Sequence, residues 1–64
     1  MLEVMIECWS GAAGVASYRW SLWQDGHRIA MGENAFASAD DCQAEATAYC
    51  QEEHGTAPDR VTRL

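Results

Sequence analysis

Residues 1–64 are predicted to form a single α+β domain, a three- or four-stranded antiparallel sheet with one amphipathic helix packed on one face. Two stretches, 2–9 and 16–24, alternate apolar and polar residues as half-buried strands do. Asp25-Gly26 is a strong hairpin signal, because a type I′ turn needs positive φ at both central positions. The stretch 38–53 repeats small or apolar residues at spacings of three and four, which indicates a helix with one packing face.

The order of the strands follows from this alternation. In the first strand, the residues expected to face inward are Leu2, Val4, Ile6 and Cys8. In the second strand, they are Tyr18, Trp20 and Leu22. The small residues at 10–14 suit a hairpin connection between the two strands. A third strand over 27–32 returns beside the second, and its alternation turns Ile29 and Met31 inward.

The helix has well-defined ends. The Ser38 hydroxyl can accept a hydrogen bond from the backbone N–H of Asp41 as an N-cap. Asp40 and Asp41 lie in the first turn, where the helix dipole favours anions. Gly55 suits the left-handed position after the last turn, so the helix is expected to end near His54.

Packing the helix on the sheet predicts a two-layer core. On the sheet side, its members are Val4, Ile6, Tyr18, Trp20, Leu22, Ile29 and Met31. On the helix side, they are Phe36, Cys42, Ala46, Tyr49 and Cys50. After the helix, Val61 and Thr62 favour a short edge strand within 59–64, although this segment could also fray.

Charge is distributed unevenly along the chain. The net charge is −6 and there is no lysine. Residues 29–57 hold six acidic and no basic residues, whereas the rest of the chain is neutral. The acidic set consists of Glu33, Asp40, Asp41, Glu45, Glu52 and Glu53. Such a field repels DNA and RNA and attracts basic protein surfaces, so we expect a basic nucleic-acid-binding protein as partner and no direct nucleic acid binding. The alternative is that the acidic helix only keeps the protein in solution.

The cysteines do not indicate an enzyme. Cys8, Cys42 and Cys50 lack the spacing of a disulfide framework and are read as reduced core thiols. No sequence feature places a thiol beside an activating base, and no cofactor motif is present. Cys50 and His54, four residues apart, supply two metal ligands, fewer than a zinc site needs, so no metal is expected.

The N-terminal segment does not resemble a signal peptide, because Glu3 and Glu7 interrupt it and no basic residue precedes them. No apolar run approaches the length needed to cross a bilayer. We therefore expect a cytoplasmic location in a bacterial host cell.

Two tryptophans are candidates for an interface. The strand alternation puts Trp9 and Trp23, with Met5, on the face opposite the helix. Exposed aromatic residues of this kind anchor partner or dimer interfaces, which is compatible with a monomer or a weak homodimer. Alternatively, the sheet curls and buries them, or a register shift of one residue exchanges the two faces.

The run YRWSLWQDGHRIAMGENAFASADDCQAEA, which starts at Tyr18, resembles the YegP-like repeat, a bacterial and archaeal family of unknown function. The resemblance covers Tyr18 to about Ala48 and implies a three-stranded sheet followed by a capped helix. The chain departs from the family pattern at Phe36, where the family favours Tyr, and in a helix without lysine. The family supplies no catalytic residues.

By type, a short, lysine-free acidic α/β chain resembles the phage-borne anti-CRISPR inhibitors, several of which present carboxylates in place of DNA phosphates. This resemblance implies a non-enzymatic inhibitor that blocks DNA recognition by a CRISPR surveillance complex, with the acidic set as the binding residues. The alternative hypothesis is a YegP-like structural or self-association module, in which Trp9 and Trp23 contact another subunit.

Overall fold

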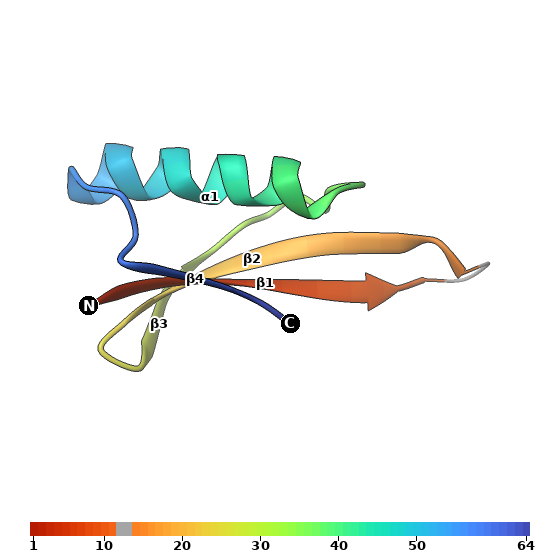
Figure 1. The fold of residues 1–64 in the computed structure, drawn as a ribbon, viewed down its shortest axis with the longest axis horizontal. Helices are drawn as coiled ribbons and strands as arrows, with labels where there is room; N and C mark the ends of the chain where they lie inside the picture. Colours follow the sequence, from red (N-terminus) through yellow and green to blue (C-terminus); the bar gives the residue numbers. More distant parts are fainter. Residues whose placement is uncertain (12–13) are drawn as a thin grey trace.

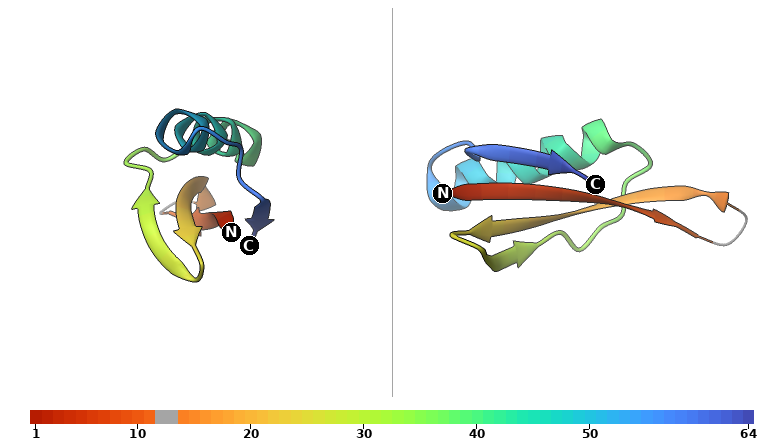
Figure 2. Two further views of the ribbon diagram at one scale, coloured as in Figure 1. Left: turned by 90° about the vertical axis from the view of Figure 1, so that its left-hand side faces the viewer. Right: turned by 60° about the horizontal axis from the view of Figure 1, so that its bottom comes forward.

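The computed structural model describes residues 1–11 and 14–64 and shows a four-stranded sheet with one helix across one face (Figure 1, Figure 2). The elements are β1 (Leu2–Ser10), β2 (Ala16–Gln24), β3 (His27–Met31), α1 (Ala39–His54) and β4 (Arg60–Arg63). The spatial order of the strands is β3-β2-β1-β4. The predicted α+β class is confirmed, including the short C-terminal strand.

The two long strands form an antiparallel hairpin at the centre of the sheet. Val4 lies opposite Leu22 and Ile6 lies opposite Trp20, so both strands turn the same apolar face toward α1. The hairpin connection predicted at 10–14 includes residues 12–13, which lie outside the described residues. The second predicted turn is confirmed, because Asp25 has φ 50° and Gly26 has φ 85°.

The prediction that Ile29 and Met31 belong to the core is wrong, because β3 contains a β-bulge. Trp23 pairs with Arg28 but Leu22 pairs with Ala30, which leaves Ile29 as one extra residue in β3. An extra residue reverses the alternation beyond it. Ala30 therefore packs against the core, while Ile29 and Met31 are exposed.

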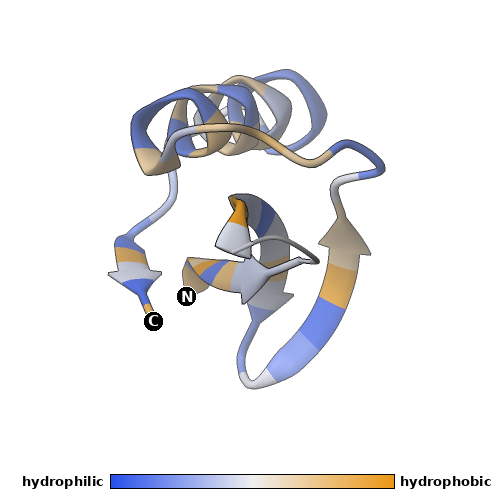
Figure 3. Ribbon diagram, turned by 90° about the vertical axis from the view of Figure 1, so that its right-hand side faces the viewer, coloured by the Kyte–Doolittle hydropathy of each residue, from blue (hydrophilic) through white to orange (hydrophobic). Residues whose placement is uncertain are grey.

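Helix α1 begins and ends as predicted. The backbone N–H of Asp41 donates to the Ser38 hydroxyl over 3.1 Å, and Gly55 closes the last turn with φ 71°. The packing face consists of Cys42, Ala46 and Cys50, all small, so the helix lies close to the sheet. Figure 3 shows hydrophilic and hydrophobic residues mixed along α1, as a helix with one packing face requires. In the described part of the chain, no helix combines the length and the apolar character needed to cross a bilayer.

The core lies between α1 and the central hairpin. Its buried members are Leu2, Val4, Ile6, Trp20, Leu22, Cys42, Ala46 and Cys50. Partly buried residues pack around them: Tyr18, Ala30, Phe36, Ala39, Tyr49 and Val61. Phe36 also extends the sheet, because it exchanges both backbone hydrogen bonds with Tyr18, at 2.8 and 2.9 Å.

Strand β4 pairs in parallel with β1, so the sheet is mixed rather than wholly antiparallel. Helix α1 runs back over the sheet and ends near the N-terminus of the chain, at the end of the sheet where β1 begins (Figure 1). A strand that enters the sheet at that end must run in the same direction as β1. Asp59 fixes the start of β4 beside β1 with two hydrogen bonds to Leu2. Its backbone N–H donates to the Leu2 carbonyl, and its carboxylate accepts from the Leu2 N–H, each over 2.8 Å.

Glu3 anchors β4 to β1 through its side chain. Its carboxylate accepts hydrogen bonds from Arg60 Nε and from the Thr62 hydroxyl, each over 2.9 Å. These two bonds lower the pKa of Glu3 from its ordinary value, and the bond from Arg60 has the larger effect. The ionised form is thus favoured in the folded chain, and its contribution to stability is present near neutral pH and disappears as the pH falls through the lowered pKa.

We predict that Glu3→Gln lowers the melting temperature at pH 7, and that the difference from the unmodified protein narrows as the pH falls below about 4. Thermal unfolding followed by circular dichroism across this pH range measures both effects. Glu53→Gln is the control, because this carboxylate is exposed and takes part in none of the ion pairs among the described residues. The prediction is contradicted if the melting temperature of Glu3→Gln differs from that of the unmodified protein by the same amount at every pH.

Candidate functional site

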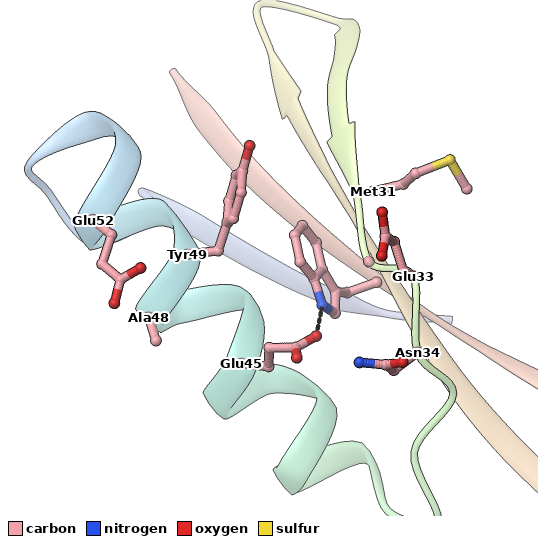
Figure 4. Close-up of a pocket in the computed structure, with 9 residues that line it drawn as sticks. Met31, Glu33, Asn34, Glu45, Ala48, Tyr49 and Glu52 are labelled. Atoms are coloured by element: carbon pink, nitrogen blue, oxygen red, sulfur yellow. Dashed lines mark hydrogen bonds between the residues drawn. The ribbon is translucent and has the colours of Figure 1, made fainter.

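The structure places four members of the acidic set on one side of α1 and Asp40 on the other. Glu45 and Glu52 line a pocket with Glu33, which stands in the segment between β3 and α1 (Figure 4). Asp41 belongs to the same side, because it precedes Glu45 by four residues on the helix. We call these four residues, Glu33, Asp41, Glu45 and Glu52, the acidic flank.

Asp40 lies on the other side of α1, next to β4. Its carboxylate accepts a hydrogen bond from Arg63 Nη2 over 2.8 Å, and the same guanidinium contacts Gln43 Oε1 at 2.7 Å. Asp40 is therefore paired with a cation of its own chain. Glu53 is exposed near the C-terminal end of the helix and lies outside the pocket.

The acidic flank is attached to the core through Trp20. The indole N–H of Trp20 donates to Glu45 Oε2 over 2.8 Å, and the indole ring packs against Tyr49 with 5.2 Å between ring centroids. Trp20 is 4% exposed, and a buried indole N–H needs an acceptor. Glu45 is thus held in one position, with its second oxygen still available to a partner.

The sequence predicted Trp20 as a core residue and Glu45 as a surface carboxylate, but it did not predict the bond between them. The signal that was present is the need of a buried tryptophan for an acceptor. Several acidic residues could have met that need. Only the position of α1 on the sheet selects Glu45.

Gly32 makes room for this arrangement. A Cβ atom at position 32 would lie 2.5 Å from Trp20 Nε1, closer than a Cβ atom approaches an atom to which it is not bonded. The backbone at Gly32 also donates to the Trp20 carbonyl over 3.0 Å. The chain leaving β3 therefore passes directly against the indole ring, and only glycine fits there.

The pocket beside Trp20 has a volume of about 450 Å³. Its lining combines aromatic rings, amide and thioether groups with three carboxylates: Trp20, Tyr49, Asn34, Met31, Glu33, Glu45 and Glu52. Among the described residues, none of the four arginines lines it. Carboxylates beside an aromatic ring suit guanidinium and ammonium groups, which form charge-assisted hydrogen bonds and contact ring faces. The chemistry of this surface is that of binding a basic side chain.

Trp9 and Trp23 lie on the sheet face opposite α1, as predicted, but in different environments. Trp9 is 56% exposed. Trp23 is half-buried, and its indole N–H donates to the Ser21 hydroxyl over 2.8 Å. The sheet therefore leaves Trp9 available to a partner and holds Trp23 against its own surface.

The prediction that all three cysteines lie in the core is wrong for Cys8, which is exposed. Its strand position is on the helix-facing side, opposite Tyr18. However, the β1–β2 hairpin extends beyond the start of α1, so the helix does not cover that end of the sheet (Figure 1). Cys42 and Cys50 are fully buried, and burial raises the pKa of both thiols.

We predict that one thiol per folded chain, that of Cys8, reacts rapidly with a disulfide reagent such as 5,5′-dithiobis(2-nitrobenzoate). Cys42 and Cys50 should react only after unfolding, since both access and thiolate formation are suppressed by burial. Spectrophotometric counting of released thiolate in buffer and in denaturant measures this difference. Rapid reaction that persists in Cys8→Ser would show that the buried thiols are accessible.

In residues 1–11 and 14–64, no three side chains of His, Cys, Asp or Glu are grouped so that they could hold a metal ion. No family model, curated protein or solved structure matches the chain. The resemblance to the YegP-like repeat and the resemblance to anti-CRISPR proteins therefore remain predictions.

Proposed function

We propose that this protein is a non-enzymatic inhibitor that binds a basic, nucleic-acid-binding surface of a protein complex and blocks DNA recognition by phosphate mimicry. The acidic flank supplies the mimicking carboxylates. The most specific form of the proposal is an anti-CRISPR protein of phage origin, whose target is a CRISPR surveillance complex in a bacterial cell.

The observation that carries the proposal is the absence of neutralising charge on the acidic flank. Across the described residues, the three ion pairs of the chain engage the carboxylates of Asp25, Glu3 and Asp40. The four carboxylates of the acidic flank take part in none of them. A surface that already repels anions and carries no cation of its own is favourable for a basic partner.

The spacing of the flank supports the same proposal. Carboxylates one helical turn apart, such as Asp41 and Glu45, are separated by about 5–6 Å between their Cβ atoms. This spacing is of the order of that between successive charges along a nucleic acid strand. A rigid helix can therefore offer several anionic contacts to one basic cleft without ordering a flexible segment, which lowers the entropic cost of binding.

The experiment measures the binding of target DNA to purified, guide-loaded CRISPR surveillance complexes in the presence of this protein. We expect the protein to compete with DNA in a mobility-shift assay, and the inhibition to weaken between about 50 and 200 mM salt, because the contacts are between charged groups. If an excess of the protein leaves DNA binding unchanged for CRISPR surveillance complexes of every type tested, the proposal that it is an anti-CRISPR protein is contradicted.

The helix provides a matched pair of variants for this assay. Asp41→Lys with Glu52→Lys reverses two charges of the acidic flank, whereas Asp40→Lys with Glu53→Lys reverses one Asp and one Glu outside it. Both double variants change the net charge equally. We expect the first to abolish inhibition and the second to retain most of it. Equal loss in both would mean that total charge, and not the flank, attracts the complex.

Glu45 is left unchanged in these variants. Its carboxylate accepts the Trp20 indole N–H, so reversing its charge would disturb the core as well as the binding surface. Circular dichroism spectra of both double variants should match that of the unmodified protein. The four chosen positions are exposed, and substitutions at such positions have small effects on stability.

A further inference from the structure

One face of the sheet is open. Helix α1 covers only the other face, and the two views of Figure 2 show no described element beneath the strands. The register places Met31 beside Ser21 and Arg28 beside Trp23 on this open face. Met31 is 58% exposed and Trp9 is 56% exposed.

In the described part of the chain, the open face carries three charged side chains without an ion pair, beside the pair that Arg60 forms with Glu3. Among the described residues, Arg60 and Arg63 form ion pairs, whereas Arg19 and Arg28 form none. Glu7 lies directly opposite Arg19 across the β1–β2 pair, yet the two make no ion pair. Arg19, Arg28 and Glu7 line a shallow hollow of about 110 Å³ together with Trp9 and Met31.

The open face is complementary to itself. Three cross-strand pairs of β1 and β2 on this face join side chains that differ in size or in charge. They are Trp9 with Ser17, Glu7 with Arg19, and Met5 with Ser21. A two-fold axis that runs parallel to these strands and between them would place β1 of one copy over β2 of the other. In these three pairs, Trp9 and Met5 would then each meet a serine, and Glu7 would meet Arg19. In the next row along the strands, Trp23 would meet Glu3, and Arg28 would meet Arg60.

We propose that the open face binds a second copy of this chain, and that the two sheets pack face to face about such an axis. Two sheets stacked face to face lie about 10 Å apart, and their strand directions differ by about 30°. Because of this angle, the residue pairs at the centre of the interface align better than those at its ends. The two ion pairs between Glu7 and Arg19 are equivalent by symmetry, as an isologous interface requires. Apolar contact comes from Trp9, Met5 and Met31.

A dimer of this kind would have to bury almost the whole open face. A typical stable interface buries about 800 Å² per partner. This is roughly one fifth of the 4166 Å² that the chain exposes. The open face spans the longest and the shortest dimension of the molecule, 38 by 17 Å (Figure 1). In this dimer, both α1 helices lie on the outside. The acidic flanks remain free, so the inference does not depend on the function proposed above.

Sedimentation equilibrium over a range of concentrations tests the dimer. We expect the mean mass to rise toward that of two chains, and Glu7→Arg or Arg19→Glu to raise the dissociation constant at least about tenfold, because like charges then meet across the axis. Asp41→Arg changes the charge as Glu7→Arg does but lies on α1, and it should leave the dissociation constant unchanged.

Mixing the two charge variants gives the decisive result. In a heterodimer of Glu7→Arg with Arg19→Glu, both contacts again join opposite charges, so the equimolar mixture should dimerise although each variant alone does not. Native mass spectrometry distinguishes this heterodimer from the homodimers by mass. The proposal is overturned if the unmodified protein stays monomeric up to about 1 mM or if each charge variant has the same dissociation constant as the unmodified protein. It is also overturned if the equimolar mixture of the two variants forms no heterodimer.

Discussion

Trp20→Ala is expected to lower the free energy of unfolding by roughly 3–5 kcal/mol. The substitution removes a buried indole that packs on Tyr49 and leaves a cavity between α1 and the sheet. Native domains are stable by about 0.05–0.15 kcal/mol per residue, which is roughly 3–10 kcal/mol for a chain of this length. The expected loss is therefore a large fraction of the total stability. Urea unfolding followed by far-ultraviolet circular dichroism measures the loss.

Two further variants separate packing from hydrogen bonding at this position. Trp20→Phe keeps an aromatic ring but removes the N–H that Glu45 accepts, and we expect a smaller loss, about 1–3 kcal/mol. Trp9→Ala removes an exposed tryptophan and should change stability by less than about 0.5 kcal/mol at low protein concentration. Equal losses for Trp20→Ala and Trp9→Ala would mean that Trp20 is not part of the core.

Local signals were sufficient to predict most of the fold. The Asp25-Gly26 turn has the positive φ angles that the sequence indicated, and Ser38 and Gly55 bound α1 as expected. Each of these features depends on a few neighbouring residues and their backbone preferences. Sequence reasoning is most effective where structure is determined in this way.

The errors concern features that depend on distant parts of the chain. In β3, apolar residues occur in succession at Ile29, Ala30 and Met31, so the sequence fits two registers equally well. The bulge selects the register that puts small Ala30 opposite Leu22, beneath the helix. The parallel direction of β4 follows from where α1 ends over the sheet, which no residue of Arg60–Arg63 specifies.

The candidate site shows the same division. The acidic set was recognised from charge alone, because its six members lie in a segment without any basic residue. Its separation into an acidic flank and a neutralised position was not, because Arg63, which pairs with Asp40, arrives with β4 from the end of the chain. The role of Gly32 was also missed, since a glycine after a strand usually indicates a turn.

Gly32→Ala is expected to destabilise the protein by about 1–3 kcal/mol, the usual cost of overpacking a core. The added methyl group would lie within 3 Å of three atoms of the Trp20 ring. The ring cannot move away without breaking its bond to Glu45 or its contact with Tyr49. Urea unfolding quantifies the loss, and the tryptophan emission spectrum reports the displaced indole.

Gly11→Ala is the control for this substitution. A Cβ atom at position 11 would lie 3.6 Å from the nearest atom outside its immediate neighbours, which is ordinary contact distance. A general effect of replacing glycine by alanine would appear in both variants. It would be stabilising, because alanine lowers the conformational entropy of the unfolded chain. Only Gly32→Ala should combine a loss of stability with altered tryptophan emission. If so, the pocket wall formed by Trp20 depends on the absence of a side chain at position 32, and the position of Glu45 in the acidic flank depends on that wall.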